Sequence, residues 1–114
     1  MRLYIGPRAT GKTAMLIRLC EESPGTVIVA PNKTSAENIE MLALELGKTI
    51  PEPITFRQFV DGRRNGTKIT GFLFDDLDRA LQIAAGVDGE ALAATMTLNE
   101  VVRPEGRNNE NNNV

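Results

Sequence analysis

The 114-residue sequence contains no histidine, no tryptophan and a single cysteine, Cys20. One thiol cannot form a disulfide within the chain, and a structural zinc site has no set of ligands to use. A catalytic triad built on histidine is excluded for the same reason. Because Cys20 lies in a predicted helix, we expect a small buried side chain rather than a nucleophile.

The sequence also lacks a long apolar run and a strong excess of one charge. Hydrophobic residues make up 41% and charged residues 25% of the chain, as in soluble globular proteins, and no run approaches the roughly 18 residues of a membrane span. The net charge of −2 gives no overall attraction to nucleic acid or to an anionic membrane, so such binding has to be local. The apolar stretch at the start of the chain is too short for a secretory signal. We therefore expect a cytoplasmic protein without a membrane partner.

The most informative segment lies near the start and reads GPRATGKT, residues 6–13. It matches the P-loop pattern G-x-x-x-x-G-K-[ST], between a predicted strand and a predicted helix. In such a loop, backbone N–H groups point at a phosphate, and the positive end of the dipole of the following helix favours the same anion. The lysine adds a positive charge, and the hydroxyl of the final residue binds Mg²⁺. We therefore predict a nucleotide site formed by Gly6, Pro7, Arg8, Ala9, Thr10, Gly11, Lys12 and Thr13, with Lys12 also catalytic and Thr13 a metal ligand.

Strands and helices alternate along the rest of the sequence. We predict strands at residues 3–5, 26–30, around 54, 68–74 and 95–98, and helices at 14–20, 35–46, 56–60, 77–85 and 89–93. The run at 26–30 is apolar throughout, which is typical of a parallel strand buried on both faces. This pattern predicts an α/β domain over residues 1–103 with a mostly parallel sheet of about five strands. Residues 104–114 are rich in asparagine and are expected to form a disordered tail.

Local patterns predict where helices begin and which faces are apolar. The capping-box pairs Thr34/Glu37 and Thr55/Gln58 mark two helix starts. Apolar side chains at helical spacing predict one buried stripe, formed by Ile39, Leu42, Ala43 and Leu46. A second set shares one face of the helix that follows residue 76, namely Leu77, Ala80, Leu81 and Ala84.

A second motif could supply the metal site. Phe72, Leu73 and Phe74 form an apolar strand that ends in Asp75, as expected for a carboxylate at the carboxyl edge of a parallel sheet. We predict that Asp75 binds Mg²⁺, directly or through water. The next residue, Asp76, is a candidate catalytic base. Alternatively, Asp75, Asp76 and Asp78 form an acidic cluster that caps the following helix.

Other polar residues allow more than one interpretation each. Thr95 and Thr97 could sense a γ-phosphate or simply favour a strand. The basic cluster Arg57, Arg63, Arg64 and Lys68 could contact DNA or RNA, or donate an arginine to a neighbouring nucleotide site, or be a solvated loop. Arg8 could reach the phosphates or point into solvent.

The order of these features resembles the first RecA-like domain of superfamily 1 and 2 helicases and related ATPases. Residues 6–13 resemble motif I, residues 27–32 motif Ia, residues 72–76 motif II and, faintly, residues 94–97 motif III. This resemblance implies a three-layer fold in which the P-loop strand neighbours the Asp75 strand, with ATP and Mg²⁺ as cofactors. The chain departs from the family in two ways. Asp76 stands where hydrolytic relatives most often have Glu, which implies slow hydrolysis, and the second helicase lobe is missing, so a homo-oligomer or a protein partner would supply an arginine.

Residues 5–18 also resemble the opening of bacterial-type thymidine kinases, but the cysteines of that family's zinc module are missing. Three functions follow: a slow Mg²⁺-dependent ATPase acting with DNA or a partner, a nucleoside kinase, and an interaction module without turnover. The sequence contains no motif that chooses between ATP and GTP, and ATP is taken from the resemblance. Small size and an asparagine-rich end suit a protein of a virus or mobile element.

Overall fold

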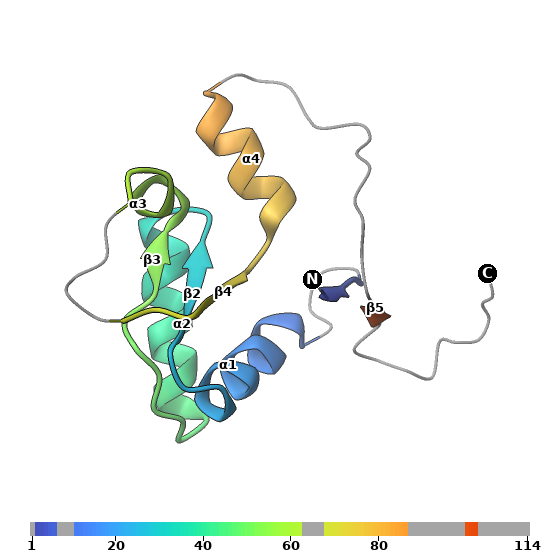
Figure 1. Ribbon diagram of the computed structural model, residues 1–114, viewed down its shortest axis with the longest axis vertical. Helices are drawn as coiled ribbons and strands as arrows, with labels where there is room; N and C mark the ends of the chain where they lie inside the picture. Colours follow the sequence, from blue (N-terminus) through green and yellow to red (C-terminus); the bar gives the residue numbers. More distant parts are fainter. Residues whose placement is uncertain (1, 7–10, 63–67, 87–99, 103–114) are drawn as a thin grey trace.

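A computed structural model describes residues 2–6, 11–62, 68–86 and 100–102. It is an α/β fold in which all described strand pairs are parallel, as predicted (Figure 1). The elements are, in order, β1 (Arg2–Tyr4), α1 (Lys12–Glu22), β2 (Thr26–Ala30), α2 (Lys33–Glu45), β3 (Ile54–Thr55), α3 (Phe56–Val60), β4 (Gly71–Phe74), α4 (Leu77–Ala85) and β5 (Glu100–Val102).

The described strands form two sheets rather than one. β2 is the centre of a three-stranded sheet of order β3-β2-β4, and β1 pairs with β5 in a two-stranded sheet. The expected pairing of the P-loop strand β1 with the Asp75 strand β4 is therefore not found among the described strands. Unbroken apolar runs indicate that strands are buried, but they do not specify which strands are neighbours. β2 takes the place beside β4, in register from Thr26 opposite Gly71 to Val29 opposite Phe74.

The three-stranded sheet has a different core on each face. Successive residues of β2 point to opposite faces, so Ile28 and Ala30 join the core formed with α1 and α2, which also contains the predicted buried Cys20. Val27 and Val29 join the other core. All four phenylalanines of the chain pack there, against β2 and β3: Phe56, Phe59, Phe72 and Phe74. β2 is thus fixed from both sides, with Ile28 and Val29 almost completely buried.

Helix starts follow the predictions only in part. α3 has the predicted capping box, in which Thr55 Oγ1 accepts from the Gln58 N–H and the Gln58 side chain accepts from the Thr55 N–H. The predicted cap at Thr34 is wrong, because α2 begins two residues earlier. Asn32 adopts an extended conformation there, and its side chain accepts from the Ser35 N–H at 2.8 Å. Asparagine is at least as good an N-cap as threonine, so the helix begins after the earlier of the two residues.

The predicted apolar faces are covered unequally. On α2, Ile39 and Ala43 are buried, whereas Leu46 is 39% exposed. On α4 only Ala80 is buried, and Leu81 is 49% exposed. Helical spacing correctly groups these residues on one face, but it does not show whether another element covers that face.

Several predictions fall at the limits of the described chain. β4 begins at Gly71, so the strand predicted at residues 68–74 is shorter than expected. Residues 89–93, 95–98 and 104–114 lie outside the described residues, and β5 follows the predicted last strand. None of the described helices is long and apolar enough to span a bilayer.

The turn before β2 provides a test of the fold. Gly25 has a φ of +88°, and a Cβ added there would lie 2.5 Å from Thr70 Oγ1. The Thr70 N–H donates to the Gly25 carbonyl at 2.7 Å, so the two segments cannot easily separate. We expect Gly25→Ala to lower the free energy of unfolding by about 2–4 kcal/mol, from backbone strain and overpacking together. Urea denaturation measures this change.

Gly47→Ala is the matched control, because Gly47 has a φ of +68° but no atom within 4 Å of an added Cβ. We expect it to cost only the left-handed strain, about 1 kcal/mol. Equal losses for the two variants would contradict a close approach between Gly25 and Thr70.

Candidate functional site

The candidate site lies at the carboxyl edge of the three-stranded sheet. Because β2, β3 and β4 run parallel, their carboxyl ends meet at one edge, where open α/β folds bind ligands. α2, α3 and α4 start within three residues of these strand ends, so helix N-termini gather there. α1 brings its first residues, Lys12 and Thr13, to the same place through the contact described below.

The loop between β1 and α1 is described at both of its ends. Gly11 precedes α1 with a φ of +82°, a conformation that favours glycine, and it makes no side-chain cap. Lys12 Nζ donates to the Gly6 carbonyl at 2.8 Å and thereby closes the loop across its ends. The predictions for Pro7, Arg8, Ala9 and Thr10 lie outside the described residues.

The hydroxyl of Thr13 meets the carboxylate of Asp75. Thr13 Oγ1 lies 3.3 Å from both Oδ1 and Oδ2, although the two residues are 62 positions apart in the chain. These distances are longer than the usual 2.7–2.8 Å of an O–H···O hydrogen bond, and one proton is shared by two acceptors, so the bond is weak. The structure thus brings together the two residues that the sequence predicts as metal ligands.

Asp75 is held in place by its backbone. Its N–H donates to the Val29 carbonyl at 2.9 Å, which continues the β2–β4 ladder one residue past the end of β4. Burial raises the pKa of the Asp75 carboxyl, the Thr13 hydrogen bond lowers it, nearby Asp76 raises it, and Lys12 lowers it. Lys12, Thr13 and Asp75 therefore form one electrostatic group, and Asp75 is a partly desolvated carboxylate.

Asp76 differs from its neighbour. It adopts the left-handed conformation, with a φ of 55° and a ψ of 52°, and its side chain does not cap α4. The alternative interpretation is confirmed in position, because Asp76 is the N-cap residue of α4 and Asp78 lies in its first turn, but no side-chain hydrogen bond of Asp76 caps the helix. Its side chain is exposed, and within the described chain it makes no hydrogen bond or ion pair. Its role as a base stays a prediction.

The described residues contain no group of three His, Cys, Asp or Glu side chains that could hold a metal. A site for nucleotide-bound Mg²⁺ does not need one, because this ion commonly uses one or two protein oxygens together with phosphate and water. Thr13 Oγ1 and an Asp75 carboxylate oxygen are such a pair. Both are hard oxygen donors, so the residues present fit the ion.

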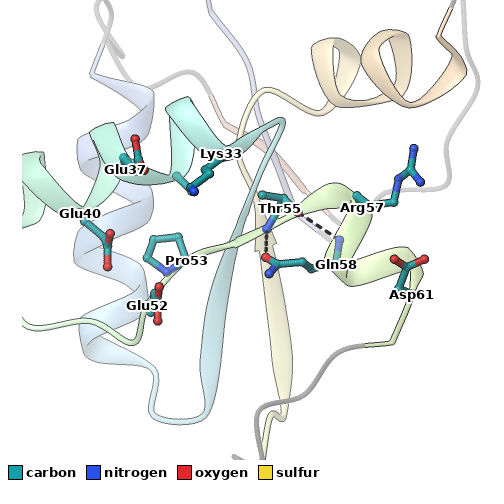
Figure 2. Close-up of a pocket in the computed structure, with 10 residues that line it drawn as sticks. Lys33, Glu37, Glu40, Glu52, Pro53, Thr55, Arg57, Gln58 and Asp61 are labelled. Atoms are coloured by element: carbon teal, nitrogen blue, oxygen red, sulfur yellow. Dashed lines mark hydrogen bonds between the residues drawn. The ribbon is translucent and has the colours of Figure 1, made fainter.

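A groove of about 410 Å³ lies between α2, the segment that leads into β3, and α3 (Figure 2). Four carboxylates and two cations line it, and none of the six forms an ion pair within the described chain. The charged residues are Lys33, Glu37, Glu40, Glu52, Arg57 and Asp61. Sequence reasoning missed this groove, because its walls come from two separate stretches of the chain, residues 33–40 and 52–61, with no shared motif.

The acidic groove bears on the predicted nucleic-acid contact. Arg57 is the one member of the basic cluster that lines it, and carboxylates outnumber cations there by four to two. A phosphate backbone would meet net repulsion at this place. Lys68 is exposed, and Arg63, Arg64, Thr95 and Thr97 lie outside the described residues. Nucleic-acid binding through the basic cluster stays a prediction.

Comparisons with protein-family models, with curated proteins and with solved structures found no match. The contacts at the sheet edge are consequently the observations on which a function can be proposed.

The raised pKa of Asp75 gives a pH test of the site. The folded protein holds this proton more tightly than the unfolded chain, so the stability of the wild type falls as pH rises from the ordinary value of 3.8 through the raised pKa. Asp75→Asn cannot ionise and avoids that loss. We expect the variant to gain stability relative to wild type between pH 4 and pH 7, as measured by urea unfolding across that range.

Asp61→Asn is the control, because Asp61 is an exposed carboxylate at the end of α3. An Asp75→Asn advantage that grows toward acid pH, or that matches the profile of Asp61→Asn, would contradict the burial of the Asp75 carboxyl.

Proposed function

We propose that this chain is a Mg²⁺-dependent nucleotide-binding protein with slow triphosphate hydrolysis. One observation carries the proposal: the threonine that ends the P-loop motif contacts the acid that ends an apolar parallel strand 62 positions later. Each motif alone could be an accident of sequence. Their convergence at the edge where α/β folds bind ligands is what a nucleotide site requires.

Each part of the site would have a separate role. The amides of residues 6–13 and the start of α1 would bind the β- and γ-phosphates, and Lys12 would add a positive charge. Lys12 Nζ already donates to the Gly6 carbonyl, so a phosphate would replace this acceptor with a stronger one. Thr13 and Asp75 would hold Mg²⁺, which neutralises phosphate charge.

ATP is proposed as the nucleotide through the resemblance to helicase-type ATPases, and the same resemblance supports a three-layer RecA-like arrangement of residues 1–103. Slow hydrolysis follows from Asp76. Its carboxylate is exposed and no described residue fixes it, so nothing holds it against an attacking water. Faster turnover would depend on an arginine from a partner or from a second copy of the chain.

The unfixed Asp76 carboxylate also favours a second function, a nucleotide-binding interaction module without turnover. The two functions share the phosphate and metal contacts and differ only in hydrolysis. No contact among the described residues specifically favours a nucleoside kinase.

The proposal predicts that Lys12 is required for binding. A charge-assisted contact contributes about 1.5–3 kcal/mol, so we expect Lys12→Ala to weaken Mg²⁺·ATP binding about 10- to 150-fold. Lys33→Ala is a closely matched control, because Lys33 is likewise the first residue of a helix near the sheet edge. It should change the affinity less than about twofold. Isothermal titration calorimetry with ATP and with GTP measures both variants and the base preference.

Absence of heat with wild-type protein, or equal losses for the two lysine variants, would refute the nucleotide site. Radiolabelled ATP then separates the two functions: turnover above a Lys12→Ala blank indicates an ATPase, and binding without turnover indicates the interaction module.

A further inference from the structure

The link between β4 and α4 consists of only two residues, Asp75 and Asp76. Asp75 is still part of the sheet, because its N–H donates to the Val29 carbonyl. α4 then begins at Leu77, and the Ala80 N–H already donates to the Asp76 carbonyl at 3.0 Å. The change of direction from strand to helix therefore falls on the backbone of a single residue, Asp76.

Asp76 makes this turn in an unusual conformation. It is the one non-glycine residue with a positive φ in the part of the chain that the structure describes. The left-handed region costs most residues about 1–2 kcal/mol, and aspartate and asparagine visit it more readily than other non-glycine residues. The Asp76 side chain caps nothing and bonds to none of the described residues, so no contact of its carboxylate explains the strained backbone.

The neighbouring geometry shows what the turn achieves. The Asp75 carboxylate must point toward Thr13, and α4 must leave the sheet edge on a path that buries Ala80. A right-handed residue at position 76 would send α4 in a different direction directly after Asp76, so that keeping Ala80 buried would require Asp75 to move. Strained backbone that persists beside a candidate site is a recognised sign of function.

We propose that Asp76 is a positioning residue, whose left-handed backbone holds the Asp75 carboxylate against Thr13 for Mg²⁺ binding. It acts through its conformation rather than as a catalytic base. This inference rests on the proposed nucleotide site and deepens it. Aspartate suits the position because it tolerates the left-handed region, yet it leaves the turn less free than glycine would.

Two uncharged substitutions separate the backbone from the charge. Asp76→Asn removes the charge but tolerates the left-handed conformation, and Asp76→Val removes both. We expect Asp76→Asn to bind Mg²⁺·ATP within about threefold of wild type and Asp76→Val to bind at least about tenfold more weakly. A β-branched residue strongly disfavours a positive φ. Titration with ATP in EDTA should show similar affinities for all three proteins, because only the Mg²⁺-dependent part is lost.

Asp78→Asn and Asp78→Val are matched controls, since Asp78 is exposed in the first turn of α4, where the backbone is helical. Both should bind like wild type. Turnover gives a further distinction: a catalytic base would make Asp76→Asn as inactive as Asp76→Val, whereas a positioning residue leaves Asp76→Asn active.

The outcomes distinguish this inference from the proposed function. If wild type binds Mg²⁺·ATP and the Asn and Val variants at position 76 lose equally, the positioning role is overturned and the nucleotide site stands. If wild type does not bind, the proposed function fails and the positioning role falls with it. Urea unfolding still tests the turn in that case: Asp76→Val should be less stable than Asp76→Asn by a wider margin than the Asp78 pair shows, and equal margins would contradict a left-handed turn.

Discussion

The contact between the Thr13 hydroxyl and the Asp75 carboxylate joins the first helix to the end of β4. At 3.3 Å to both oxygens the hydrogen bond is too weak to hold these elements together by itself. The packing beneath it must do so. Ile17 of α1 is fully buried against the sheet in the same core as Ile28 of β2, and burying one such side chain contributes about 1.5–3 kcal/mol. The site is thus a consequence of the core.

The position of β2 in turn fixes the position of Asp75. Its alternate residues enter the cores on the two faces of the sheet, so a shift by one residue would exchange every buried side chain between two differently shaped environments. The register with β4 is therefore fixed, and the backbone bond from Asp75 to Val29 extends it to the carboxyl edge. An acid one residue past a strand is placed reliably only when the register of that strand is fixed.

Local patterns in the sequence predicted local structure well and long-range pairing poorly. The capping box of Thr55 and Gln58 needs only four consecutive residues, and both of its hydrogen bonds are present. The capping box predicted at Thr34 was wrong, because Asn32, two residues earlier, is the N-cap of α2. The order of the strands in the sheets could not be predicted, because an apolar strand sequence does not indicate which other strand pairs with it. The motifs did predict that Thr13 and Asp75 would share a site, but no pattern revealed the left-handed backbone between Asp75 and α4.

The charges beside β4 and in the groove limit what can bind at the described sheet. Beside β4, the Lys12 ammonium donates to the Gly6 carbonyl, and Asp75 and Asp76 place two carboxylates nearby. Between α2 and α3, the groove presents two more carboxylates than cations. An extended polyanion without its own cations would meet net negative charge at both places. A compact anion that carries its own cation, such as a nucleotide with Mg²⁺, would present the cation to Asp75 and its phosphates to Lys12. The charge pattern therefore favours a small phosphate ligand beside Thr13 and Asp75 over a nucleic-acid strand that runs across the sheet.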